Sequence, residues 1–146
     1  MTGAASGARI VVIDTDVWSR LALPKARAHP LAAAWKSELL GATVVIAAQT
    51  RAEVLAGLLI RNWGGKRAAA ARAVLDGTPT IPVDGSVIDA YAQLQADCRA
   101  MGHALHEKIH TADRWVAATA LAHGWELLAG DGIYKQAPGL RVIDID

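Results

Sequence analysis

Four acidic residues stand where predicted strands end or predicted helices begin, which are places where carboxylates can do chemistry together. Asp14 ends the apolar run IVVI and Asp131 follows WELLAG, while Glu53 and Asp113 lie in the first turns of two predicted helices. Several carboxylates in one pocket repel one another, and some must bind a proton unless a cation compensates. Oxygen ligands without Cys or His favour Mg²⁺ or Mn²⁺, ions that polarise phosphoryl oxygens and activate water. The four acids therefore indicate metal-dependent phosphate chemistry.

Each acid also has a purely structural explanation. Asp14 or Asp16 could cap the N-terminus of the next helix, and the segment TRAE at 50–53 matches a capping box. Asp113 could complement the dipole of its own helix, and the Asp131–Gly132 pair could form a turn. Taken singly these explanations suffice, but they do not explain why all four acids fall on one rim of the predicted sheet.

Hydrophobic patterning predicts strands that alternate with helices along the chain. The predicted strands are 9–13, 43–48, 79–83, 125–129 and 140–144. The predicted helices are 30–40, 50–62, 66–75, 84–101 and 111–123. This alternation predicts an α/β fold, a three-layer α/β/α sandwich with a central, mainly parallel sheet in one domain over residues 1–146. Since ligands of parallel sheets bind beyond the carboxyl ends of the strands, the acids should share one site.

The composition indicates a folded cytoplasmic protein. Hydrophobic residues make up 53% of the chain, yet no window approaches the ~18 apolar residues of a membrane span, and MTGAASGAR does not read as a signal peptide. The one cysteine, Cys98, excludes an internal disulfide, and we expect it to fill the core. Residues 1–75 carry ten Lys or Arg against four Asp or Glu, and residues 76–146 carry five against ten. This asymmetry hints at a polyanionic partner, or is ordinary surface variation.

Four segments carry a resemblance to a known family. They are VVIDTDVW, TRAEVLAGL, TADRWVAATAL and LLAGDGIYKQAPGLRVI, in that order over nearly the whole chain. With these segments the chain resembles a PIN domain, specifically a VapC-type toxin ribonuclease. There are three departures from the family pattern: Ala129 stands where Thr or Ser is usual, Tyr134 replaces Phe, and Ala112 stands where Asn is frequent. They weaken the match at Asp131 most.

The resemblance implies an Mg²⁺- or Mn²⁺-dependent endoribonuclease. By position, Asp14, Asp113 and Asp131 match the acids that hold the metal, and Glu53 matches the acid that binds or orients the attacking water. Thr15 matches a small polar residue whose hydroxyl assists the site. The resemblance also implies an RNA substrate, a homodimer and a small antitoxin partner that lays an apolar segment into a groove.

Basic residues beside the acids are candidates for substrate contacts. Arg51 and Arg114 each stand close in sequence to an acid, so we predict that they clamp phosphate. Basic residues over 51–72 would follow the RNA backbone, and RNA affinity should then fall steeply with salt; they are Arg51, Arg61, Lys66, Arg67 and Arg72. Trp63 ends a helix that is apolar on more than one face, which makes it a candidate for an interaction surface.

Two other function classes remain open. His106, Glu107 and His110 match H-E-x-x-H, the zinc-hydrolase signature, which requires both histidines on one continuous helix. Gly102 before this motif and Thr111 after it favour a connector instead, with His110 near the active rim. The third class is a non-catalytic RNA- or protein-binding module of the same fold, against which the presence of all four acids argues.

Overall fold

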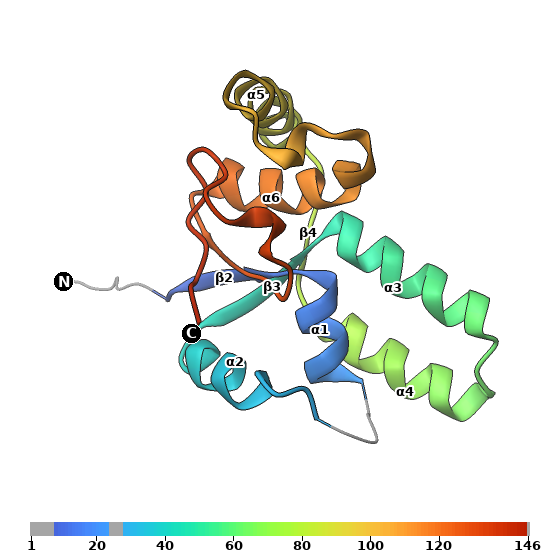
Figure 1. The fold of residues 1–146 in the computed structure, drawn as a ribbon. Coiled ribbons are helices and arrows are strands. Elements are labelled where there is room, and N and C mark those ends of the chain that lie inside the picture. The colour runs from blue at the N-terminus through green and yellow to red at the C-terminus, as the bar shows by residue number, and fades with distance from the viewer. Residues whose placement is uncertain (1–7, 24–27, 146) are drawn as a thin grey trace.

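The computed structural model describes residues 8–23 and 28–145 (Figure 1). A sheet of four parallel strands lies at the centre, in the order β4-β3-β2-β5. The strands are β2 (Ile10–Ile13), β3 (Thr43–Ala47), β4 (Thr80–Ile81) and β5 (Glu126–Leu128). The two middle strands are the apolar runs that the sequence marks as buried, and β4, whose predicted segment contains two prolines, is an edge.

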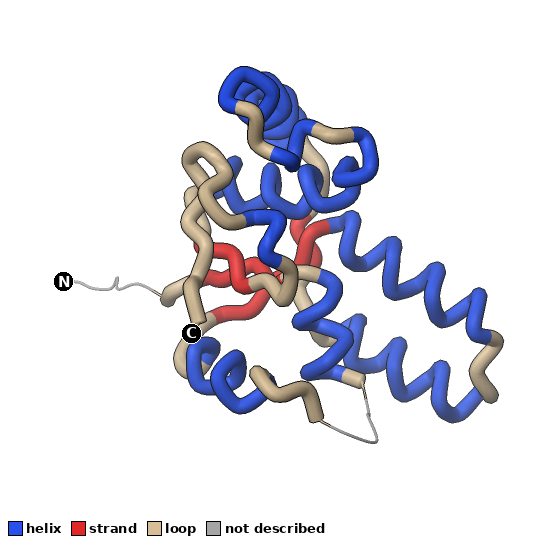
Figure 2. Tube along the Cα trace, in the orientation of Figure 1, coloured by secondary structure: helices blue, strands red, loops and turns tan. Residues whose placement is uncertain are grey.

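Helices cover both faces of this sheet (Figure 2). The α-helices are α1 (Thr15–Ala22), α2 (Ala32–Leu39), α3 (Ala48–Arg61), α4 (Gly65–Asp76), α5 (Gly85–Met101) and α6 (Thr111–His123). Three short 3₁₀ helices are η1 (Ala104–His106), η2 (Lys108–His110) and η3 (Gly132–Tyr134). In Figure 1, α6 lies against one face with α5 outside it, α1 and α2 lie on the other face, and α3 and α4 form a hairpin that projects sideways.

The alternation of side chains along β2 creates two hydrophobic cores. Val11 and Ile13 belong to the core beneath α1 and α2, where Trp18 and Trp35 are buried. Val12 points to the other face and packs in the core with α5 and α6. Because successive strand residues face opposite sides of a sheet, a continuous apolar strand is what a two-sided core requires. The predicted three-layer fold is confirmed.

Several details of the sequence prediction need correction. The predicted strand 140–144 is wrong: it makes a single bridge, Leu127 to Val142, at the outer edge of the three-residue strand β5. The helix predicted at 50–62 begins earlier, because its N-cap is Ala47, so Thr50 and Glu53 form no capping box. The prediction that Cys98 fills the core is confirmed, since its side chain is fully buried. Within the described residues, no helix has the length and apolarity needed to cross a membrane.

Candidate active site

A cleft of about 430 Å³ opens where the carboxyl ends of β2 and β5 meet the N-termini of α1 and α6. All four predicted acids line it, so the parallel topology does bring residues from distant segments together. The lining residues are Asp14, Thr15, Asp16, Ser19, Arg20, Glu53, Arg61, Asp113, Val116, Asp131 and Tyr134. The cleft is therefore rich in carboxylates and contains no sulfur ligand.

Asp14 is the buried acid of the cleft and also the N-cap of α1. Its side chain is 4% exposed, and it accepts hydrogen bonds from the backbone N–H of Val17 (2.8 Å) and of Gly130 (3.2 Å). Burial raises the pKa of Asp14 to about 6, and the negative charges of Asp16 and Asp113 add to this rise, while the two backbone hydrogen bonds oppose it. Asp14 can therefore cap α1 and also belong to a functional site. A cap alone does not require that the carboxylate be buried beside the negative charges of Asp16 and Asp113.

Thr15 links the first turn of α1 to α3. Its hydroxyl lies 2.5 Å from Oε1 of Glu53 and 3.1 Å from Oγ1 of the fully buried Thr50. A hydroxyl carries one proton, so it donates to one of these oxygens at a time. Glu53 itself is exposed to solvent. The Thr15 hydroxyl therefore orients the Glu53 carboxylate at the mouth of the cleft.

Asp113 is held from two sides. The hydroxyl of Tyr134 donates to Oδ1 at 3.1 Å, and Nδ1 of His110 lies 3.1 Å from Oδ2. Burial raises the pKa of Tyr134 far above its usual range, and the negative charges of Asp113 and Asp14 raise it further. The phenol therefore stays protonated and acts as a donor. The expectation that His110 lies near the active rim is confirmed.

Asp131 is an exposed acid of the cleft and directly precedes η3. It is the N-cap of that helix, and its Oδ1 accepts from the N–H of Ile133 at 3.0 Å. The turn that we considered as a structural explanation is thus present, and the same residue lines the cleft.

Asp16 is a cleft acid that the sequence analysis treated only as a possible cap. Its carboxylate pairs with Arg20 at 3.0 Å and lies directly against Gly130, where any side chain would collide with Oδ2 of Asp16. The signal available in the sequence was the pair Asp14 and Asp16 at the start of one helix, with Arg20 four residues beyond Asp16.

The arginines of the cleft are not the predicted ones. Arg51 turns away to Asp76, Leu75 and Thr80 on the α4 side. Arg114 is 3% exposed, and it donates to the carbonyl oxygens of Leu105 (2.6 Å) and Glu107 (2.7 Å) and to the Tyr91 hydroxyl. The structure therefore brings neither arginine into the cleft, because residues one or two positions apart on a helix do not share a face.

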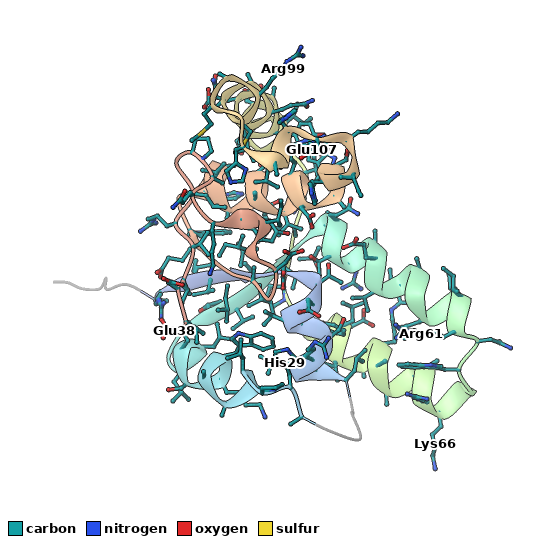
Figure 3. The ribbon with its side chains drawn as sticks, viewed as in Figure 1. His29, Glu38, Arg61, Lys66, Arg99 and Glu107 are labelled. Carbon is teal, nitrogen blue, oxygen red and sulfur yellow. The ribbon has the colours of Figure 1, made fainter. Side chains whose placement is uncertain are left out.

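Arg20 and Arg61 line the cleft instead. Arg61 comes from the end of α3 and lies on the side of the α3–α4 hairpin that faces α1, whereas Lys66 points outward from the hairpin (Figure 3).

The H-E-x-x-H segment does not form the geometry of a zinc hydrolase. His106 ends η1 and His110 ends η2, with Glu107 between the two short helices, so no continuous helix places both imidazoles on one face. The prediction that this segment is a connector is confirmed. The buried Arg114 guanidinium holds the connector through its two carbonyl oxygens.

A second hollow, of about 490 Å³, lies between α3 and α4. Apolar side chains dominate its lining, which consists of Leu55, Leu58, Leu59, Asn62, Trp63, Ala68, Ala69 and Arg72. Trp63 is half-buried, and the guanidinium of Arg67 lies 3.9 Å from its ring centroid. We call this hollow the hairpin groove.

The acids of the cleft fit a hard divalent cation by chemistry and charge. The ligands are oxygens only, and a cation would relieve the repulsion that contributes to the raised pKa of Asp14. In the part of the chain that the structure describes, no three Asp, Glu, His or Cys groups are close enough to ligate one ion in their present positions. Binding would therefore require some of these side chains to move toward a shared ion.

Comparisons with known proteins agree with the fold. The family model of the PIN domain matches residues 11–140. VapC ribonuclease Y4jK of Sinorhizobium fredii is 31% identical over 142 residues, which is 92% of this chain and 96% of that protein.

Solved structures also share the fold. VapBC2 from Rickettsia felis, bound to a promoter DNA fragment, has a TM-score of 0.73 at 16% identity and covers 94% of this chain and 99% of its own. VapBC-5 from Mycobacterium tuberculosis, of a family of toxin-antitoxin systems, has a TM-score of 0.64 at 21% identity, with 93% and 98% covered. This chain belongs to the PIN-domain family, and the resemblance drawn from its four segments is confirmed.

Proposed function

We propose that this protein is an endoribonuclease that uses Mg²⁺ or Mn²⁺ to hydrolyse RNA phosphodiesters. The observation that carries the proposal is the convergence of five carboxylates in one cleft of a PIN-domain chain. These are Asp14, Asp16, Glu53, Asp113 and Asp131. Identity of 31% to a protein named as a ribonuclease, over nearly the full length of both chains, supports the same reaction.

Each group of residues in the cleft has a different proposed role. Asp14, Asp113 and Asp131 would hold the cation, which supplies charge neutralisation and activation of water when bound. Glu53, oriented by the Thr15 hydroxyl, accepts a proton from the attacking water. In-line attack forms a bond from the water oxygen to the phosphorus and breaks the bond to the 3′ oxygen, which takes a proton from solvent, leaving a 5′-phosphate and a 3′-hydroxyl. Arg61 and Arg20 place positive charge beside this acidic cleft.

The proposed path of the RNA depends on which basic side chains are not already paired with a carboxylate. Arg51 and Arg72 share the carboxylate of Asp76, at 2.5 Å and 3.2 Å. Arg61 lines the cleft, and Lys66 is exposed at the start of α4. We propose that Arg61 contacts the phosphate nearest the cleft and that Lys66 contributes to the field that attracts the strand.

The partner that we propose is an antitoxin, since one structural neighbour belongs to a toxin-antitoxin family. Its apolar segment would dock in the hairpin groove, where Leu59 is 82% exposed and lines the hollow. Ile60 is equally exposed but does not line it. Leu59→Asp should therefore abolish antitoxin binding and Ile60→Asp should preserve it. We propose that the protein acts in the cytoplasm as a homodimer.

The test of the reaction is cleavage of a total-RNA pool by purified protein. We expect no cleavage in EDTA and discrete fragments with 5′-phosphate ends once Mg²⁺ or Mn²⁺ is restored. Cleavage at an undiminished rate in EDTA would contradict the metal-dependent mechanism.

A further inference from the structure

Asp131 and Tyr134 stand at the two ends of the short helix η3, Asp131 as its N-cap and Tyr134 as its last residue, yet they meet the cleft in different ways. Asp131 is the N-cap of η3 and is exposed, whereas Tyr134 ends η3 and is 1% exposed. The Tyr134 ring packs in the core that contains Val12 and Ala117. Its hydroxyl reaches out of this core to Oδ1 of Asp113 on α6. The short segment 131–134 therefore supplies one acid of the cleft, Asp131, and contacts a second, Asp113.

The hydrogen bond has a fixed donor and a fixed acceptor. A phenol whose ring is locked in a core has little freedom to move its hydroxyl, and the hydroxyl is the donor because an oxygen of the Asp113 carboxylate accepts. Among the described residues, the bond to Asp113 is the only side-chain hydrogen bond that the Tyr134 hydroxyl makes. Since a hydrogen bond to a charged acceptor is stronger than a neutral one, it restricts the rotation of the Asp113 carboxylate.

We propose that Tyr134 is a positioning residue for the reaction: its hydroxyl, opposite the His110 imidazole, holds the Asp113 carboxylate in the orientation in which it binds the divalent cation. This inference rests on the proposed function, because Asp113 is a ligand only if the cleft binds an ion. Neighbours that orient a ligand from outside the coordination sphere typically change metal affinity by about 10- to 100-fold. Tyr134 touches neither the substrate nor the ion in this account, and acts through Asp113.

The chain provides a matched control, because it contains two tyrosines. Tyr91 also uses its hydroxyl inside the protein, where it accepts hydrogen bonds from Arg114 at 3.2 Å and 3.1 Å. Tyr91→Phe and Tyr134→Phe each remove one internal hydroxyl and leave the ring. Only the second removes a contact to an acid of the cleft.

The experiment is calorimetric titration of Mn²⁺ into the wild type and both variants, with circular dichroism as the check of folding. We expect Tyr134→Phe to bind Mn²⁺ about 10- to 100-fold more weakly than the wild type, and Tyr91→Phe to bind it with unchanged affinity. Affinity in Tyr134→Phe within about twofold of the wild type overturns the inference and leaves the proposed function intact. A wild type that binds neither Mn²⁺ nor Mg²⁺ overturns both.

A second measurement covers the case in which Tyr134→Phe does not fold. Protein labelled with ¹³C at the ζ carbon of tyrosine gives one signal per tyrosine, and Tyr91→Phe identifies that of Tyr134. Saturating Mg²⁺ should shift the Tyr134 signal and leave the Tyr91 signal in place, because only Tyr134 bonds to a ligand. A Tyr134 signal that Mg²⁺ does not move would overturn the inference.

Discussion

The acidic cleft and the connector at 103–110 both contain residues of metal-binding type, and they differ in how those residues are brought together. The connector holds its histidines and Glu107 within eight consecutive positions, while the acids of the cleft are spread from Asp14 to Asp131. The short spacing does not produce a site, because two 3₁₀ helices interrupt the required helix. The long spacing does produce a cleft, because parallel strands end at one edge of the sheet.

The polar groups of the connector also have other partners. The His103 ring lies 2.8 Å from the carbonyl oxygen of Lys135 and accepts from the N–H of Leu105. Arg114 holds the backbone of the connector by donating to the carbonyl oxygens of Leu105 and Glu107. In the cleft, by contrast, Asp14 is buried beside other acids and carries a raised pKa. Unfavourable charge that the fold retains is a better sign of function than a match to a short motif.

We expect the largest difference between the cleft and the connector in the RNA cleavage rate, when one carboxylate of each region is replaced by an amide. Glu53→Gln should lower the RNA cleavage rate at least about 100-fold, because an amide cannot accept the proton of the attacking water. Glu107→Gln makes the same chemical change in the connector and should leave the rate unchanged. Single-turnover cleavage of one defined RNA measures both. A severe loss in Glu107→Gln with an active Glu53→Gln would reverse the assignment.

The next effect is on stability, and it follows from the raised pKa of Asp14. A folded-state pKa of about 6, against an ordinary value of 3.8 for the Asp carboxyl, means that the folded protein retains this proton over a pH range where the unfolded chain loses it. Stability of the cation-free protein should therefore fall as pH rises from about 4 to above 6, by roughly 3 kcal/mol from this group.

Asp14→Asn should remove that pH dependence, since an amide does not titrate, and it should keep the helix cap. Urea unfolding in EDTA at several pH values, compared between wild type and variant, measures the difference. Parallel stability curves for the two proteins across this range would show that Asp14 has no raised pKa.

A feature of the fold or of the candidate site could be predicted from the sequence when it depends on neighbouring residues. It could not be predicted when it depends on contacts between distant segments. The apolar runs that became β2 and β3, and the acid that ends β2, were recognisable because a buried parallel strand has a local signature. The strand predicted at 140–144 failed because its pairing depends on β5, which offers only three residues.

The errors at the site have the same origin. Arg51 and Arg114 are near acids in sequence, but the face that each takes depends on where its helix packs, and Arg114 is buried beneath the connector. The carboxylate of Asp16 reaches the cleft beside a glycine 114 positions later in the chain, a contact that exists only after folding. Tyr134 was recognised only as a variant aromatic, since nothing local shows that its hydroxyl reaches Asp113.

The smallest expected effect concerns RNA binding and compares two arginines of one helix. Arg61→Gln should weaken RNA binding several-fold and reduce the slope of affinity against salt by about 1, because one phosphate contact is lost. Arg51→Gln should leave the salt slope unchanged, since Arg51 pairs with Asp76 outside the cleft. Fluorescence anisotropy at several salt concentrations measures both, and equal slopes for Arg61→Gln and the wild type would exclude that contact.

The central claim is that Asp14 serves chemistry beyond capping a helix, and the chain offers a matched test of it. Asp84 is the N-cap of α5 and accepts from the N–H of Val87 at 3.0 Å, as Asp14 does from Val17, but it lies outside the cleft. Asn is also a good N-cap, so Asp14→Asn and Asp84→Asn should both preserve their helices.

The measurement is cleavage of total RNA by the wild type and these two variants, in EDTA and after Mg²⁺, Mn²⁺ or Zn²⁺ is restored. We predict discrete fragments from the wild type and from Asp84→Asn with Mg²⁺ or Mn²⁺, and none from Asp14→Asn. Wild-type cleavage by Asp14→Asn, or cleavage that only Zn²⁺ restores, would contradict the account.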